Sequence, residues 1–98
     1  MNDEARAAVA TVKIDNDRVR VTEWRFPPNA ATGWHRHDYD YVVVPMTTGR
    51  LRLVGDGSDV DRSADLVTGE PYTRLAGVEH DVVNDNDFEF IFVEVEIK

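Results

Sequence analysis

The sequence predicts an all-β protein, and three observations lead to this fold class. Short apolar segments rich in Val, Ile, Phe and Tyr are separated by Gly, Pro, Asn and Asp at intervals of about 8–12 residues. Beyond the first few residues, no segment carries the apolar period of a helix. The length of 98 residues allows one domain. We therefore expect a single β-sandwich or β-barrel over residues 9–98, preceded by a flexible N-terminus over residues 1–8.

The composition excludes several classes of protein. Nineteen acidic against eleven basic residues give a formal charge of −8, which argues against nucleic-acid or anionic-membrane partners. Cysteine is absent, so a metal could be held only by histidine, carboxylate or tyrosine. The N-terminus lacks the basic start and apolar run of a signal peptide, and no apolar run is long enough for a membrane span. We therefore expect a cytoplasmic protein.

The first two strands are expected over residues 9–14 and 18–26. The first alternates loosely between apolar and polar residues and ends at the turn signal Asp15-Asn16-Asp17. The second ends at Pro27-Pro28, because proline cannot continue a hydrogen-bonded ladder inside a sheet.

A histidine pair leads into the next strand. His35 and His37 are separated by one residue and are followed by Tyr and Val residues up to Pro45, a composition typical of strands. Alternate strand residues project to the same face about 7 Å apart, whereas the same spacing on a helix points them nearly opposite ways. On a strand the two imidazoles therefore converge on one point, as in the first half of a metal site.

Further strands follow between Gly-, Asn- and Asp-rich turns. Residues 50–54 form a strand after the turn at 46–49, and residues 55–59 have the composition of a loop tip. A short edge strand is expected over residues 60–67. The remaining strands are expected over residues 72–75, 80–83 and 88–98.

The last strand predicts an assembly. One of its faces would consist of Ile91, Val93, Val95 and Ile97, which we expect to line the core. The other face would carry Phe88, Phe90 and Phe92, where a monomer would meet water. An apolar patch of this kind usually marks a contact, so the pattern predicts a two-fold homodimer. The alternative is that an N-terminal strand of the same chain covers the phenylalanines.

The third histidine completes a pattern that resembles a known family. His80 begins a short strand after a turn at Gly77, so it could face the interior beside the first pair. Asn29 followed after five residues by His35-Arg36-His37 resembles the first motif of the cupins, with Asn in place of Gly. Asn is the next-best residue for a positive φ. The second cupin motif is matched by Gly69, Leu75-Ala76-Gly77, His80 and Asn84, with Leu75 in place of the usual proline.

The resemblance implies a small single-domain cupin with a jelly-roll (double-stranded β-helix) barrel. It also implies one divalent transition metal (Fe, Mn, Ni, Zn or Cu) with His35, His37 and His80 as ligands, and no other cofactor. The family's glutamate ligand is absent, and Tyr41 stands near its position with the strand parity of the histidines. Tyr41 is therefore the candidate catalytic residue, as a ligand or as a hydrogen-bonding partner of water or substrate; the alternative is a packing aromatic. Asp40 should face outward unless a bulge shifts the register.

A narrower resemblance adds a metabolic context. The tract from Trp24-Arg25-Phe26 through the histidine pair to Pro45 is similar to small cupins associated with β-alanine degradation. This implies a pathway rather than a reaction.

Three functions remain open on the sequence. The first is a metal-dependent enzyme of dioxygenase, isomerase or lyase type that acts on a small polar metabolite, whose carboxylate could bind Arg50, Arg52, Tyr72 or Arg74. The second is a non-catalytic metabolite-binding or sensor protein, favoured by the missing glutamate. In the third, the barrel is empty and the histidines are only hydrogen-bonded.

Overall fold

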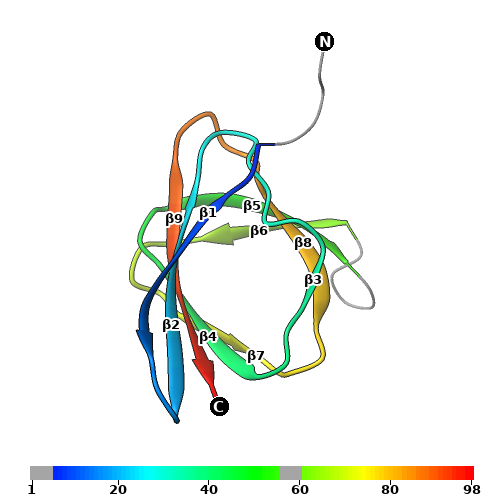
Figure 1. Cartoon of the computed structure of the whole chain (residues 1–98). Helices are drawn as coiled ribbons and strands as arrows, with labels where there is room; N and C mark the ends of the chain where they lie inside the picture. The colour runs from blue at the N-terminus through cyan, green and yellow to red at the C-terminus, as the bar shows by residue number, and fades with distance from the viewer. Residues whose placement is uncertain (1–5, 56–60) are drawn as a thin grey trace.

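The computed structural model describes residues 6–55 and 61–98, which form nine β-strands and no helix. Their bounds are β1 (Val9–Asp15), β2 (Val19–Phe26), β3 (His35–Arg36), β4 (Asp40–Pro45), β5 (Gly49–Gly55), β6 (Arg62–Leu66), β7 (Tyr72–Arg74), β8 (Glu79–Asn84) and β9 (Phe90–Ile97). A five-stranded sheet has the order β1-β2-β9-β4-β7, and a four-stranded sheet has the order β3-β8-β5-β6. Figure 1 shows the two sheets curving around a common centre as the walls of a barrel. The all-β prediction is confirmed.

Parts of three predicted segments lie outside the described residues. They are residues 1–5 of the N-terminus, residues 56–59 of the expected loop, and residue 60 of the expected edge strand. Ala7 forms a bridge with Ala31, and the backbone N–H of Ala8 donates to the carbonyl of Ala31 at 2.9 Å. Flexibility of residues 1–8 stays a prediction. In the part of the chain that the structure describes, no helix is long and apolar enough to span a membrane.

Strand β1 lies at the edge of the five-stranded sheet and on the outside of the barrel (Figure 1). Among the strands of the described residues it pairs only with β2, and all seven of its residues are exposed. The register shifts between Val12 and Ile14, so Lys13 occupies a bulge. The strand therefore adds ladder hydrogen bonds to β2 but contributes little to the buried core.

The inward face of β9 is opposite to the one predicted. Phe90 and Phe92 are buried in the core, whereas Ile91, Val93 and Val95 are half-buried on the outer face of the sheet. The prediction was wrong because both faces of β9 are apolar, so alternation alone cannot choose between them. The interior of a barrel needs large side chains, and the ring of Phe92 lies 5.3 Å from that of Phe26.

Cross-strand pairing with β9 determines which residues of the other strands in the five-stranded sheet face inward. Directly opposed residues share a face, and Glu94 of β9 is opposed to Thr22 of β2 and Val43 of β4. In the same way Tyr41 of β4 is opposed to Arg74 of β7. Aromatic and charged side chains therefore enter the interior from β4, β7 and β9 at the same end of the barrel.

Asn84, at the end of β8, is fully buried and hydrogen-bonds two segments that are distant in the sequence. Its side-chain NH₂ group lies 3.0, 3.2 and 2.8 Å from the carbonyl oxygens of Phe26, Pro27 and Phe88. Its backbone carbonyl accepts the N–H of Asn29, whose φ of 66° confirms the left-handed conformation expected for that residue. One side chain thus joins the end of β2 to the approach to β9.

Candidate metal centre

Three segments bring the histidines together. His35 on β3 and His80 on β8 are direct cross-strand partners, so their side chains share a face. His37 lies just after β3, and two backbone hydrogen bonds hold it to the turn before β8. Its N–H donates to the carbonyl of Val78 at 2.8 Å, and its carbonyl accepts the N–H of Gly77 at 2.7 Å. Gly77 has a φ of 99°, a conformation that favours glycine.

The three imidazoles meet through the same ring atom. The Nε2 atom of His37 lies 2.9 Å from Nε2 of His35 and 3.0 Å from Nε2 of His80. The described residues contain one group of this kind that could hold a metal ion, and its members are these three histidines. The structure therefore brings together all three residues predicted as metal ligands.

The tautomer of His35 follows from its surroundings. Its Nδ1 atom lies 2.8 Å from the carbonyl oxygen of Gly33, and a carbonyl can only accept a hydrogen bond. Nδ1 therefore carries the proton, which leaves Nε2 with a lone pair directed at the other two histidines. An outer hydrogen bond of this type orients a metal-binding histidine in many metalloproteins.

His37 is held as a neutral imidazole. Burial lowers its pKa to about 3, with smaller contributions in the same direction from His35, His80 and Arg74. A neutral ring is the form that can donate a lone pair to a metal ion. At neutral pH the centre of the site is therefore prepared for a cation.

Tyr41 faces inward and Asp40 faces outward, as strand parity predicts. Tyr41 is buried, and its ring stacks on the His37 ring with centroids 3.8 Å apart and planes 18° apart. Asp40 is exposed, and its carboxylate accepts the backbone N–H of Ala76 at 2.8 Å. The stacking shows that Tyr41 fixes the orientation of the His37 ring. Its role as a catalytic residue stays a prediction.

A buried carboxylate that the sequence reasoning missed lines the same cavity. The Oε2 atom of Glu94 on β9 lies 4.0 Å from Nδ1 of His37, the ring nitrogen that does not contact the other two histidines. The pKa of Glu94 is raised to about 7, mainly by burial and to a smaller extent by the nearby Glu96. The indole N–H of Trp24 lowers it, although it lies outside full hydrogen-bond geometry. Glu94 has the parity of Phe90 and Phe92, so its inward position follows from the sequence only when the facing of β9 is known.

The raised pKa of Glu94 predicts a pH-dependent effect of Glu94→Gln on the metal-free protein. The folded protein keeps the proton up to about pH 7, whereas the unfolded chain loses it near 4.5. The stability that protonated Glu94 contributes is therefore complete below pH 4.5 and is lost as the pH rises to 7. Glu94→Gln avoids this loss, so its stability relative to wild type should rise over that interval by up to about 3 kcal/mol.

Urea unfolding in the presence of a chelator would measure this difference at a series of pH values. The lowered pKa of His37 acts in the opposite sense, since its contribution is lost as the pH falls from 6.5 towards 3. It is present in both proteins and therefore largely cancels in their difference. A stability difference that did not change with pH would contradict a raised pKa at Glu94.

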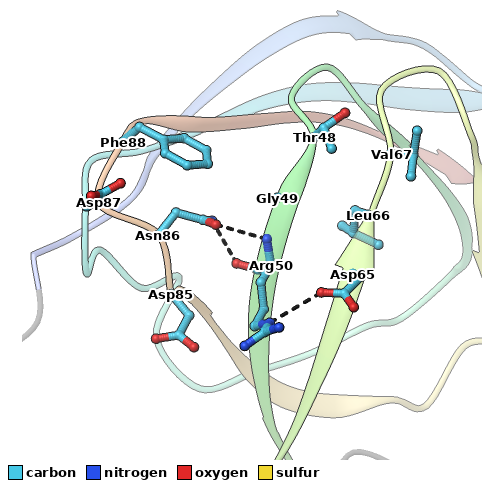
Figure 2. A pocket seen from close by; sticks show the side chains of 10 residues that line it. All are labelled: Thr48, Gly49, Arg50, Asp65, Leu66, Val67, Asp85, Asn86, Asp87 and Phe88. Carbon is cyan, nitrogen blue, oxygen red and sulfur yellow. Dashed lines mark hydrogen bonds and ion pairs between the residues drawn. The ribbon is translucent and has the colours of Figure 1, made fainter.

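The structure also decides which of the candidate carboxylate-binding residues point inward. Arg50 lies on the outer side of β5 and pairs at 3.2 Å with Asp65, its neighbour on β6, and both line a surface groove of about 660 Å³ (Figure 2). Arg52 is exposed as well and pairs with Asp61 at 2.8 Å. Tyr72 and Arg74 on β7 have the inward parity of Tyr41 and Val43, their partners on β4. Of the four candidates, only Tyr72 and Arg74 face the interior.

The comparisons with known proteins agree with this architecture. No protein-family model matches the chain. The chain is 57% identical over 91 residues to the β-alanine degradation protein BauB of Pseudomonas aeruginosa, an alignment that covers 93% of this chain and 94% of that protein. A cupin domain from Bordetella pertussis Tohama I is 56% identical, with a TM-score of 0.93 and 99% of each chain covered.

The fold itself extends to more distant proteins. A cupin superfamily protein from Desulfitobacterium hafniense DCB-2 is 14% identical, with a TM-score of 0.71 over 99% of this chain and 83% of that one. The double-stranded β-helix expected from the two motifs is therefore confirmed. On the identity and coverage of its relatives, the chain belongs to the cupin superfamily, in the group of small cupins that includes BauB.

Proposed function

We propose that this protein is a metal-dependent enzyme that acts on a small polar metabolite. The observation that carries the proposal is the convergence of three Nε2 atoms: that of His37 lies 2.9 Å from that of His35 and 3.0 Å from that of His80. They meet in a cavity where burial keeps the ring of His37 neutral. Imidazole suits Fe, Mn, Ni, Zn and Cu, and the chain has no cysteine to select among them.

The donor set fits one divalent metal ion. Three neutral imidazoles from His35, His37 and His80 would hold the ion. Three protein ligands would leave coordination positions for water. A metal bound there would act as a Lewis acid on a coordinated oxygen.

The surrounding side chains would support such an ion in different ways. Gly33 holds His35 in the metal-binding tautomer, and Tyr41 packs against the face of His37. Glu94 lies within ion-pair distance of His37 Nδ1, where a carboxylate can fix the ring and accept its proton. With a raised pKa, Glu94 can also take up and release a proton near neutral pH.

The relative's name suggests the metabolic setting of the reaction. BauB is described as a β-alanine degradation protein. We therefore propose a short carboxylate from that route as the substrate class, and an oxygenase, isomerase or lyase reaction. The cytoplasmic location expected from the sequence belongs to the same proposal.

A second candidate is a metabolite-binding or sensor protein. The observation that favours it is the replacement of the family's glutamate in the first motif, near which Tyr41 stacks on His37. Such a protein would bind its ligand without consuming it, with or without a metal.

Metal analysis of protein purified without a histidine tag tests the first step of the proposed enzyme. We expect about one equivalent of a transition metal, removable by a chelator. Incubation of the reloaded protein with short carboxylates, followed by NMR of the small molecules, then separates turnover from binding. Protein that takes up none of the five metals would refute the metal-dependent enzyme. Binding of a short carboxylate by that metal-free protein would then support the second candidate.

We further propose that two copies associate through the outer face of the five-stranded sheet. With Phe90 and Phe92 in the core, this face replaces the phenylalanine patch as the predicted contact. Its apolar side chains, called here the outer valine face, are Val19, Val21, Val42, Val44, Ile91, Val93, Val95 and Ile97. They form continuous cross-strand rows, such as Val21, Val95 and Val42. Because each copy carries a charge of −8, an apolar contact is the one that two copies can form with least repulsion.

Val95→Glu tests this contact. We expect wild-type protein to sediment as a dimer at micromolar concentration and Val95→Glu to sediment as a monomer, because the charge would be buried without a partner. Val67→Glu is the control, since Val67 is 52% exposed and lies just beyond the opposite sheet's edge strand. A wild-type monomer, or a Val95→Glu dimer, would exclude the outer valine face as the contact.

A further inference from the structure

We infer that the cleft between β6 and β7 binds the substrate as a small aliphatic carboxylate, held by Arg62 and Arg74. This rests on the proposed function, because it assigns the ligand class of the same centre. Strand β6 is an edge strand of the four-stranded sheet and β7 is an edge strand of the five-stranded sheet. No hydrogen-bonded ladder joins these two strands. The barrel is therefore open between them.

The side chains that line the opening come from the inner faces of both edges. On β6, Arg62, Ala64 and Leu66 share one parity, and Ala64 and Leu66 pack partly buried against the core. On β7, Tyr72 and Arg74 are the inward residues. All five line one cleft of about 390 Å³. The cleft therefore contains one guanidinium group from each strand and an apolar floor formed by Ala64 and Leu66.

The volumes show why a metabolite would occupy this cleft. The cavity around the three histidines has a volume of about 10 Å³, enough for an ion or a water molecule but not for an organic molecule. The side chain of Tyr72 lines both this cavity and the cleft. A ligand in the cleft would therefore lie next to the histidines, with Tyr72 between them.

The charges in the cleft favour an anion at its inner side. Arg74 is the cross-strand partner of Tyr41, whose ring stacks on that of His37, so Arg74 lies on the side of the cleft towards the histidine site. The acidic residues of the cleft are Asp65, which pairs with Arg50 on the outer face, and the exposed Glu70. Guanidinium groups bind carboxylates in bidentate fashion, and the floor of Ala64 and Leu66 suits a short aliphatic body.

Binding of propionate tests the inference without any assay of turnover. We expect saturable NMR shifts of the protein with propionate at millimolar concentration, and none with propionamide, which has nearly the same shape but no charge. Arg74→Gln should weaken propionate binding by about 10-fold or more. Arg62→Gln, at an exposed position of the same cleft, should also weaken propionate binding. The matched control is Arg52→Gln, on the outward side of β5, which should change the affinity less than about 2-fold.

The metal content of the same samples separates this inference from the proposed function. If Arg74→Gln loses propionate binding but keeps the metal of the wild type, the cleft assignment is supported. Arg74-dependent propionate binding by a protein that takes up no metal would support the cleft and refute the metal enzyme. The inference is overturned by equal binding of propionamide, by equal losses in Arg52→Gln and Arg74→Gln, or by no saturable shift with propionate.

Discussion

Replacing His80 by Ala is expected to reduce metal affinity by more than about 100-fold, because even outer partners of metal ligands cost 10–100-fold when removed. The remaining pair, His35 and His37, comes from one short segment and would hold the ion from one side only. Plasma emission analysis of dialysed protein, with competition by a chelator of known affinity, would measure the loss.

Two further variants make this result specific. Arg36→Ala changes an exposed side chain between the two first histidines and should retain the metal. His80→Gln keeps a polar side chain of similar size at a buried position, so it distinguishes loss of a ligand from loss of the fold. Metal content unchanged in a variant with all three histidines replaced would place the ion elsewhere on the protein.

Asn84→Ala is expected to destabilise the protein by about 2–4 kcal/mol, with no residue of the metal centre touched. The side chain is fully buried, and its NH₂ group serves the carbonyls of Phe26, Pro27 and Phe88. Its removal would leave buried acceptors without donors and a small cavity. For a domain of this size the melting temperature should fall by roughly 10–25 °C.

Asn16→Ala is the matched control for this effect. Asn16 also hydrogen-bonds the backbone, but as an acceptor and in an exposed turn. Its side-chain oxygen accepts the N–H groups of Arg18 and Val19 at 2.9 and 3.0 Å. Water can replace its contacts, so the expected cost is below about 1 kcal/mol. Similar melting temperatures for the two variants would show that the buried network carries no special weight.

Turn residues and β-branched segments were enough to predict most of the fold. Strand β4 follows an apolar run, and β2 and β5 follow segments in which apolar residues alternate with polar ones. All three end at Pro or Gly, and both signals act locally. The facing of β9 could not be predicted in this way. Its two faces are both apolar, and which one is buried depends on β2 and β4, its neighbours in the sheet but not in the sequence.

The same distinction explains what was found and missed at the site. His35 and His37 were predicted because a period of two places them on one face, and His80 because a family motif supplies the missing long-range link. Glu94 was missed as a direct consequence of the reversed β9. Arg74 could be named as a candidate but not chosen over Arg50, since the orientation of each depends on its cross-strand partner.

The exposed edge strand β1 has a consequence for solubility. A free strand edge with Val9, Val12 and Ile14 more than 45% exposed is a template on which further chains could add without limit. The bulge at Lys13 interrupts the regular spacing of donors and acceptors, and its ammonium group would have to be desolvated by an incoming strand. Fibril growth along this edge is therefore opposed, and replacement of Lys13 by Val should make the protein more prone to aggregate.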